Sequence, residues 1–354
     1  MLKPLLNSIT NCTKPYHFNY NTNQLLITYF QRKPIKGFHF SVEIIFNDLR
    51  KNLSSKFSQK TIISKYYSKG FLPRLYNCIQ AFFNQSNINH VTGDISYVGI
   101  FLQKNKTIHT ILDCVFLQHK KGIRKQLLKY FWLTMPINQS RFITTISHSV
   151  KKEIVEHSNC NADKIIVIPI AVGTEFVYTP KQFNTILPRV LLIGTAPNKN
   201  VHRTLQALAT INCFVNIVGK YQPEIESKIK KLHIPFQYDS NLDSVAMKAR
   251  YDEADILVFA STYEGFGMPI IEAQSVGVAV VTSNISSMPE VANGAAVFVD
   301  PYNIDAIKAG INTVINNEIL RKQNIENGLQ NVKQYTSKRI AQQYMDLYNQ
   351  VLNK

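Results

Sequence analysis

The feature that most constrains the fold of this chain is a stretch near residues 255–300 with two apolar runs around a glycine-rich loop. The first run reads DILVFAS and the second VAVVTS, and both have the β-branched composition of buried strands. The segment between them reads STYEGFGMPIIEAQ, in which Gly-Phe-Gly and Pro269 favour a loop that turns into a helix. This order predicts a βαβ unit of a parallel sheet.

Two glutamates, Glu264 and Glu272, stand eight residues apart around this loop. They follow the carboxyl end of a predicted strand, which is where doubly wound sheets bind ligands. Carboxylates can accept hydrogen bonds from sugar hydroxyls, and the helix start offers free N–H groups to phosphates. The alternatives are a solvated loop acid at Glu264 and an acid at Glu272 favoured by the helix dipole. The pattern indicates sugar transfer from a nucleotide.

The rest of the chain repeats this alternation of strands and helices. At 354 residues, the length suits two α/β domains. Residues 176–188 are polar and bracketed by prolines, which predicts a linker. Strand patterns are expected at residues 23–30, 95–102, 107–117, 141–147, 164–170, 189–195, 213–219 and 295–301. These patterns predict an α/β protein with two doubly wound domains, residues 1–180 and 187–336.

Charge is distributed unevenly between the two halves. Residues 1–180 hold 23 Lys and Arg against 8 Asp and Glu, whereas residues 181–354 hold 17 against 15. A basic half suggests an anionic partner, either nucleic acid or the cytoplasmic leaflet, although solubility alone can also explain it. No nucleic-acid-binding module is recognisable, so we expect no nucleic acid partner.

One basic segment, residues 117–135, has the pattern of a helix that lies in a membrane interface. A helix that covers the N-terminal core with a solvated basic face would show the same pattern. We favour contact with an anionic membrane surface, because the surplus charge of the whole half agrees with it. The basic strip contains Lys120, Lys121, Arg124, Lys125 and Lys129, and the apolar side contains Ile123, Leu127, Phe131 and Trp132.

The five cysteines are scattered and show no C-x-x-C spacing. Disulfides and a zinc site are therefore not expected, and a reducing cytoplasm is the natural compartment. No apolar run approaches the roughly 18 residues of a membrane-spanning helix. The predicted location is cytoplasmic and peripheral at the inner face of the membrane.

Several motifs together resemble the retaining glycosyltransferases of family 4, which have the GT-B fold. They are EGFGMPIIEA with its E-x7-E spacing, SSMPEV, VFVDP, GTAPNKN, HVTGDISY and TISHSVKKEI. The resemblance covers roughly residues 25–350. It implies two Rossmann-like domains facing across a cleft, with an acceptor-binding N-terminal domain and a donor-binding C-terminal domain. It also implies a C-terminal helix, residues 337–354, that crosses back to the N-terminal domain.

The resemblance assigns roles in the donor site. Glu264 matches a glutamate that contacts hydroxyls of the donor sugar, Glu272 one that binds the ribose, and Lys199 a lysine that neutralises the diphosphate. A fixed ammonium suits this task because charge develops on the leaving group. The other expected donor-binding residues are Gly265, Phe266, Gly267, Met268, Gly194, Thr195 and Asn200.

In the N-terminal domain, Asp113 is expected to be catalytic. Leu112 stands where relatives often have a histidine, and Thr195 where many have an arginine. His109 lies on the opposite face of its predicted strand and is a poor replacement for that histidine. Further possible cleft residues are His90, Asp94, Ser147 and Gly37; for His90, a structural role is an equal alternative.

The predicted function is transfer of a hexose from a nucleoside diphosphate sugar to a glycan or lipid-linked glycan. No metal and no cofactor are expected, since Lys199 and helix amides can balance the phosphate charge. The resemblance implies retention through a front-face route. Two alternatives remain: a GT-B sugar-nucleotide epimerase, and a catalytically weak nucleotide- or glycan-binding partner protein, suggested by Thr195 and Leu112.

Overall fold

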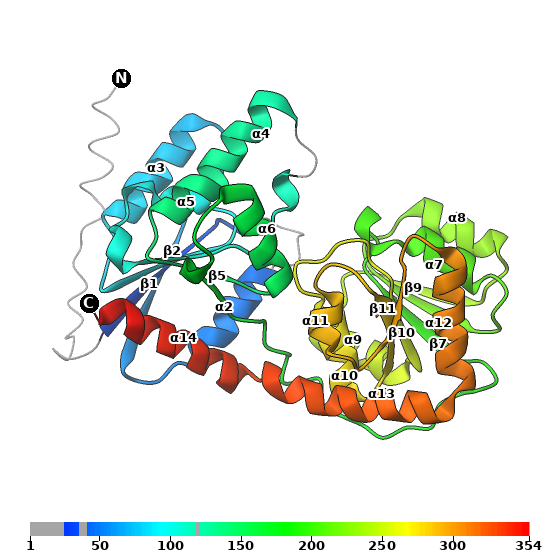
Figure 1. The fold of residues 1–354 in the computed structure, drawn as a ribbon. Coiled ribbons are helices and arrows are strands. Elements are labelled where there is room, and N and C mark those ends of the chain that lie inside the picture. The colour runs from blue at the N-terminus through cyan, green and yellow to red at the C-terminus, as the bar shows by residue number, and fades with distance from the viewer. Residues whose placement is uncertain (1–24, 35–40, 118–120, 354) are drawn as a thin grey trace.

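The computed structural model describes residues 25–34, 41–117 and 121–353. The chain forms two α/β units joined side by side (Figure 1), each built on a six-stranded parallel sheet. The N-terminal sheet has the order β2-β1-β3-β4-β5-β6. Its strands are β1 (Leu25–Gln31), β2 (Phe57–Ile63), β3 (Ile88–Thr92), β4 (Thr107–Thr110), β5 (Phe142–Thr145) and β6 (Ile165–Val167). The helices of this unit are α2 (Ser41–Lys51), α3 (Phe71–Phe82), α4 (Gly122–Lys129), α5 (Met135–Asn138) and α6 (His148–Ser158).

The C-terminal sheet has the order β12-β11-β10-β7-β8-β9. Its strands are β7 (Arg189–Ile193), β8 (Phe214–Val218), β9 (Phe236–Asp239), β10 (Ile256–Phe259), β11 (Ala279–Ser283) and β12 (Val297–Val299). Its helices are α7 (Val201–Leu208), α8 (Pro223–Lys231), α9 (Ser244–Glu253), α10 (Met268–Val276), α11 (Met288–Ala292), α12 (Ile304–Asn316) and α13 (Glu318–Asn331). The strand order reverses between β7 and β10, and such a switch point is the usual ligand-binding position of an open α/β sheet.

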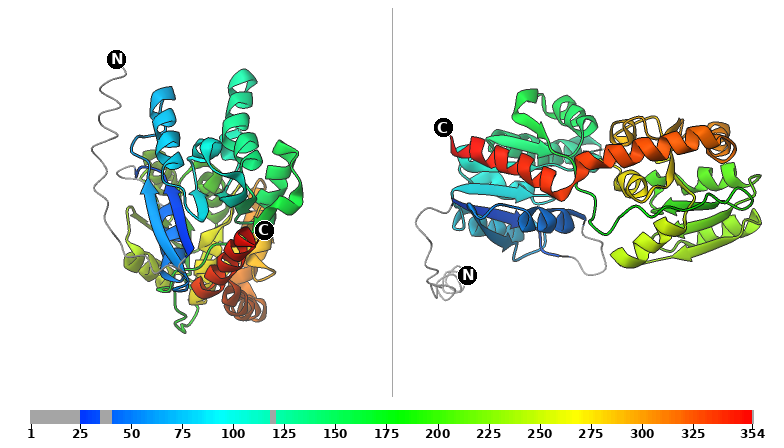
Figure 2. Two further views of the ribbon diagram at one scale, coloured as in Figure 1. Left: turned by 90° about the vertical axis from the view of Figure 1, so that its left-hand side faces the viewer. Right: turned by 90° about the horizontal axis from the view of Figure 1, so that it is seen from below.

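The last helix, α14 (Ser337–Leu352), leaves the C-terminal unit and packs on the N-terminal one (Figure 2). Its Tyr348 hydroxyl lies 2.9 Å from the Tyr29 hydroxyl of β1 and 2.9 Å from His90 Nδ1 of β3. Tyr344 and Leu347 are also buried in the same core. The predicted return of the C-terminal helix is therefore confirmed.

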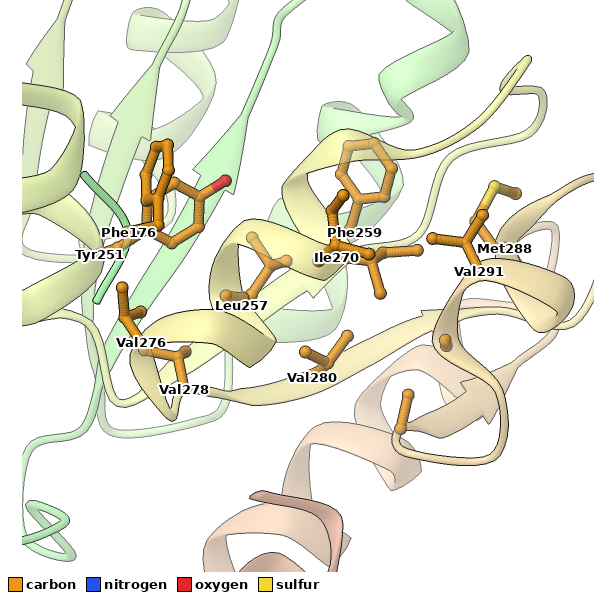
Figure 3. Packing of buried hydrophobic residues seen from close by; sticks show 14 of the residues in the cluster. Phe176, Tyr251, Leu257, Phe259, Ile270, Val276, Val278, Val280, Met288 and Val291 are labelled. Carbon is orange, nitrogen blue, oxygen red and sulfur yellow. The ribbon is translucent and has the colours of Figure 1, made fainter. Parts of the chain in front are cut away.

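A continuous apolar core supports the loop that follows β10 (Figure 3). Phe259 and Ile270 lie directly below this loop, and Val280 of β11 packs beside them. The rings of Phe176 and Tyr251 meet edge to face, with their centroids 5.4 Å apart. These contacts join β10, α10 and α9 into one rigid base, so that the loop has a fixed support.

Some predicted elements are wrong. The apolar run at residues 95–102 forms a 3₁₀ helix, Ser96–Phe101, and not a strand. A short buried apolar run fits either structure, and the turn at Gly93, with φ +74°, sends the chain away from the sheet. Strands β2 and β9 were not predicted, because both are edge strands with polar residues and lack an apolar run. Within the described residues, no helix combines the length and apolarity needed to cross a bilayer.

Candidate functional site

The loops that follow β7 and β10 meet at the switch point of the C-terminal sheet. Their backbones are joined directly, since the Thr262 N–H donates to the Asn198 carbonyl at 2.8 Å. The Asn198 side chain donates to the Tyr263 carbonyl at 2.9 Å. Two segments about 65 residues apart in sequence, 194–200 and 260–267, thus form one surface.

Lys199 and Glu264 form an ion pair on this surface. The Lys199 Nζ lies 2.7 Å from Glu264 Oε1, and the two side chains are only 20% and 13% exposed. Gly194 has φ +82°, and a Cβ there would lie 2.8 Å from Lys199 Cε. The lysine stem therefore lies over Gly194, which explains why this position needs glycine. A charge-assisted hydrogen bond holds the ammonium in place before any ligand arrives.

Two serines hold the Glu264 loop from the other side. Ser287 Oγ donates to the Phe266 carbonyl at 2.6 Å and to the Glu264 carbonyl at 3.0 Å. Ser286 Oγ donates to the same Glu264 carbonyl at 2.8 Å. Gly267, with φ +108°, then starts α10 at Met268. The SSMPEV motif therefore fixes the conformation of the loop that carries Glu264.

Glu272 lies on the first turns of α10, where it is half-buried. Its Oε2 accepts a hydrogen bond of 2.6 Å from the Tyr251 hydroxyl of α9, and Tyr251 is fully buried. Burial raises the pKa of Glu272 to about 7, while the Tyr251 hydrogen bond and the charge of Lys199 act in the opposite direction. Tyr251 thus orients one carboxylate oxygen and leaves the other for a ligand.

The Glu264 loop also forms the contact between the two units. A Cβ at Gly265 would lie 2.6 Å from the Leu112 carbonyl oxygen of the N-terminal unit. Ser147 Oγ, at the start of α6, donates to the Gly265 carbonyl at 2.7 Å. The Tyr263 hydroxyl donates to Glu153 of α6 at 2.8 Å. Gly265 is thus needed for close approach between the units.

A carboxylate from the C-terminal unit caps a helix of the N-terminal unit. Glu290 of α11 accepts hydrogen bonds from the His148 N–H at 2.8 and 2.9 Å and from the Ser149 N–H at 3.2 Å. These N–H groups belong to the first turn of α6, where an anion is favoured by the unpaired donors and the helix dipole. The contact binds the two units at a second point.

Asp113 lines a small pocket of the N-terminal unit. Leu112, whose carbonyl oxygen faces Gly265, lines the same pocket. Burial raises the pKa of Asp113, while the Val115 N–H donates to its Oδ1 at 3.1 Å and lowers it. Asp94 lines the pocket too and forms an ion pair with Arg32. The full lining is Gly93, Asp94, Ser96, Thr110, Ile111, Leu112, Asp113, Phe116 and Trp132. Two carboxylates beside two aromatic rings form a setting suited to a polar ring with an apolar face.

Four of the predicted site residues have side chains that the structure engages elsewhere. His90 is fully buried, and both ring nitrogens are used, by the Tyr348 hydroxyl and by Thr110 Oγ1 at 2.8 Å. Its role is structural. Phe266 is buried in the core, with its ring 5.7 Å from that of Tyr335, and does not face the site.

The side chains of Thr195 and Asn200 are bonded to backbone carbonyls. Thr195 Oγ1 donates to the Lys220 carbonyl at 2.7 Å. The Asn200 amide donates to the Ala260 and Pro301 carbonyls at 3.0 and 2.6 Å. Both side chains brace neighbouring loops, because each donates to backbone carbonyls, and Asn200 Oδ1 accepts from the Arg203 guanidinium at 2.9 Å.

The other predicted residues lie at the site or at its edge. Ser147 lies at the contact between the units, but its hydroxyl is already used by Gly265 and by the Val150 N–H at 3.1 Å. Gly37 and Lys120 lie outside the described residues. Among the described residues no cluster of three His, Cys, Asp or Glu suited to a metal ion occurs. Metal independence stays a prediction.

Sequence reasoning missed Tyr251, Asn198 and Glu290. The sequence YDEAD at residues 251–255 is typical of the polar face of a helix, whereas Tyr251 is buried and donates a hydrogen bond to Glu272. The available signal is a tyrosine among acids in the helix that precedes Glu272. Nothing in the sequence indicated that Glu290 would reach the other unit.

The C-terminal unit matches a known family: residues 183–331 match the model described as Glycosyl transferases group 1. The chain is 28% identical over 238 residues to O-antigen chain mannosyltransferase B of Escherichia coli, across 60% of this chain and 61% of that protein. It is 25% identical over 224 residues to O-antigen chain mannosyltransferase RfbU of Salmonella typhimurium, across 60% and 62%. The chain thus spans about three fifths of the length of these curated relatives.

Solved structures agree in fold at low sequence identity. A glycosyltransferase from Rickettsia africae superposes with a TM-score of 0.71 at 19% identity, across 93% of this chain and 99% of that one. Anabaena HepE in complex with UDP and glucose superposes with a TM-score of 0.76 at 14% identity, across 92% and 100%. The chain therefore has the GT-B fold, and its residues 183–331 match the group 1 glycosyl transferases.

Proposed function

We propose that this protein is a retaining, metal-independent glycosyltransferase of family 4. It moves a hexose from a nucleoside diphosphate sugar to a glycan or lipid-linked glycan in surface polysaccharide synthesis. The observation that carries the proposal is the Lys199–Glu264 pair at the switch point, beside Glu272. Two relatives are O-antigen mannosyltransferases, so mannose is the first hexose to test.

The donor lies along the loop between β10 and α10. Its diphosphate accepts hydrogen bonds from Lys199 and from the free N–H of Met268 at the start of α10. As Lys199 turns to the phosphate, the Glu264 carboxylate becomes available to the sugar hydroxyls. Glu272, oriented by Tyr251, accepts from the ribose diol.

The reaction follows a front-face route. The acceptor hydroxyl attacks the anomeric carbon on the side from which the diphosphate leaves, and a phosphate oxygen takes the hydroxyl proton. The glycosidic bond to phosphate breaks as the new one forms, so the configuration is retained. Lys199 offsets the charge that develops on the leaving group, a task that does not require a metal ion.

The acceptor occupies the pocket of the N-terminal unit. Asp113 lies next to the donor loop, since a Cβ added at Gly265 would lie 3.5 Å from Asp113 Cβ. Its carboxyl group orients the acceptor hydroxyl, while Trp132 and Phe116 contact the apolar face of the sugar ring. The enzyme works at the cytoplasmic face of the membrane, where Lys121, Arg124, Lys125 and Lys129 of the α4 region contact anionic lipid.

Assays with a panel of donors test this function. Purified protein is incubated with GDP-mannose, UDP-glucose or UDP-N-acetylglucosamine, with and without a membrane lipid extract and with EDTA. We expect release of the nucleoside diphosphate and transfer of the hexose with retained configuration, unaffected by EDTA. Isomerised donor would point to an epimerase, and binding without turnover to a partner protein. The relatives are transferases and favour neither alternative.

Replacing Gly265 with alanine is expected to lower turnover roughly 10- to 100-fold, because the added Cβ would collide with the Leu112 carbonyl oxygen and misplace the reacting groups. Initial rates with the best donor measure the effect. Gly99→Ala is the matched control, since its nearest neighbour, His109 Nδ1, is 3.9 Å away. Equal rates in the two variants would show that the contact between the units is not needed for turnover.

Affinity for a nucleoside diphosphate is expected to rise with pH around the raised Glu272 pKa of about 7. The neutral carboxyl is favoured in the free protein below this value, and only the ionised form accepts from both ribose hydroxyls. Tyr251→Phe removes a hydrogen bond that lowers this pKa. The midpoint of the pH dependence of affinity should therefore lie at higher pH in this variant than in wild type. Calorimetric titrations with a nucleoside diphosphate, at pH values on both sides of the Glu272 pKa, measure the midpoint in wild type and in the variant.

Glu272→Gln is the control for this pH dependence, because the phosphate groups titrate near pH 6 in every variant. The difference between the two profiles isolates Glu272. If wild type and Glu272→Gln show the same profile, Glu272 does not contact the ribose in its ionised form.

A further inference from the structure

Helix α3 exposes its large apolar side chains and buries its small and polar ones. Leu72 and Phe83 remain 73% and 72% exposed, and Ile79 and Phe82 are exposed on the same side. Leu72, Ile79 and Phe83 stand at i, i+7 and i+11, so they form one stripe along the helix. A helix that only covered a core would turn these residues inward.

The opposite face of α3 explains this orientation. Its buried residues are Asn77, Cys78 and Ala81. The Asn77 amide donates to the Tyr66 carbonyl at 2.9 Å and to the Tyr97 hydroxyl at 3.0 Å, and its Oδ1 accepts from the Tyr66 N–H. These bonds fix which face of α3 points inward, so the apolar stripe stays in solvent.

Helix α4 has the same property. The sequence left open whether its apolar side covers the N-terminal core, and the structure shows that no residue of Gly122–Lys129 is buried. Ile123 is 79% exposed, and Leu127 is exposed too. Trp132, expected on this apolar side, instead packs on Tyr97 with ring centroids 5.6 Å apart.

The two helices belong to one surface. Both project from the same end of the N-terminal unit (Figures 1 and 2). Arg74 of α3 lies over the ring of Trp132, 4.9 Å from its centroid, and Trp132 belongs to the π-helical turn that continues α4. We call this the α3–α4 surface, formed by Leu72, Ile79, Phe82, Phe83, Ile123 and Leu127 with Lys121, Arg124, Lys125 and Lys129.

The charge around this surface identifies its occupant. Residues 121–135 carry the four cations of this surface and contain no Asp or Glu. A second copy bound through the same surface would place these cations opposite one another with no acid from this segment between them. Lys65 lies 5.3 Å from the Tyr76 ring centroid, an arrangement in which an apolar face is bordered by cations. An anionic lipid surface matches both the charge and the apolar stripe.

The geometry points to α3 as an apolar anchor that inserts into the interfacial layer of an anionic membrane, with α4 beside it contacting the headgroups. This inference deepens the proposed function, since it places the enzyme on the surface that holds a lipid-linked acceptor. It differs from binding by the basic strip alone, because an inserted apolar stripe still binds when salt screens the charges.

Vesicle flotation tests the anchor. The full chain is mixed with phosphatidylcholine vesicles, with or without phosphatidylglycerol, at about 0.1 M and about 1 M salt. We expect binding to the anionic vesicles that weakens but persists at high salt. Leu72→Ser/Phe83→Ser should lower the partition coefficient roughly 10- to 100-fold at both salt concentrations, because apolar side chains no longer enter the membrane. Lys125→Gln/Lys129→Gln should lower it mainly at low salt.

Ile319→Ser is the matched control, since this residue of α13 is 83% exposed but lies in the C-terminal unit. Its partition coefficient should equal that of wild type. Unchanged flotation of the Leu72/Phe83 variant would overturn the proposal, as would failure of wild type to bind anionic vesicles. Self-association of wild type that the variant abolishes, without vesicle binding, would instead assign the surface to a second copy.

Failure of the membrane anchor can be distinguished from failure of the proposed enzymatic function. The Leu72/Phe83 variant should bind a nucleoside diphosphate as wild type does, because the α3–α4 surface lies in the other unit. Lys199→Ala should float with vesicles as wild type does. Flotation without any donor turnover would therefore reject the enzymatic proposal alone, and turnover without flotation would reject the anchor alone.

Discussion

Replacing Lys199 with alanine is expected to lower donor turnover roughly 10²- to 10³-fold, the range found when one preorganised charge-stabilising donor is removed. The ammonium lies 2.7 Å from Glu264 and is the cation that meets the leaving diphosphate in the proposed reaction. Its removal also leaves the largely buried Glu264 carboxylate without its ion-pair partner, next to the place where the diphosphate binds. Both the donor affinity and the rate of the chemical step should fall, and initial rates across donor concentrations measure them.

Lys230→Ala serves as the control for this variant. Lys230 pairs with Glu226 at 2.6 Å on α8, where it is exposed, so its loss removes one lysine and one ion pair without touching the site. Lys199→Arg keeps the charge and tests whether the compact ammonium is needed. If Lys199→Ala turns over donor at the rate of Lys230→Ala, Lys199 has no role in the reaction.

Replacing Glu272 with alanine is expected to weaken binding of a nucleoside diphosphate roughly 10- to 150-fold, since a hydrogen bond to a charged group contributes about 1.5–3 kcal/mol. In the proposed complex the carboxylate held by Tyr251 accepts from the ribose hydroxyls. Wild type should therefore prefer the ribonucleotide over its 2′,3′-dideoxy analogue by a similar factor. The variant should bind the two nucleotides equally, and calorimetry distinguishes these results.

Glu253→Ala, which removes an exposed acid of α9 paired with Arg250, controls for the loss of one negative charge. This variant should retain the preference for the ribonucleotide. Discrimination that survives in Glu272→Ala would move ribose recognition to another residue. Because Glu272 is half-buried, the thermal melting curve of each variant is compared with that of wild type to check that the variant folds.

The frame of the candidate site could be predicted from the sequence, because it depends on local patterns and on one topological rule. Apolar runs before Gly194 and before Glu264 predict strands, and loops that follow strands β7 and β10 meet at the switch point. This rule brings Lys199 and Glu264 together although 65 residues separate them. Neither step requires knowledge of how the side chains pack.

The roles of individual polar side chains could not be predicted in this way. Thr195 and Asn200 lie in the loop that follows β7, as predicted, but each side chain donates to a backbone carbonyl of another segment. Phe266 lies between two site glycines, yet the ring of Tyr335, 69 residues later, completes the core that buries it. Such choices depend on long-range packing, which no local pattern encodes.

The crossing of α14 has a consequence for the order in which the chain folds during synthesis. Tyr29 and Tyr348 are 319 residues apart, yet they share a hydrogen bond in the core of the first unit. That core lacks Tyr344 and Tyr348 until residues 337–352 have been synthesised, whereas residues 187–336 already contain every strand of the second sheet. Of these two units, the N-terminal one therefore completes its folding after the C-terminal one, contrary to the common N-to-C order of domain folding.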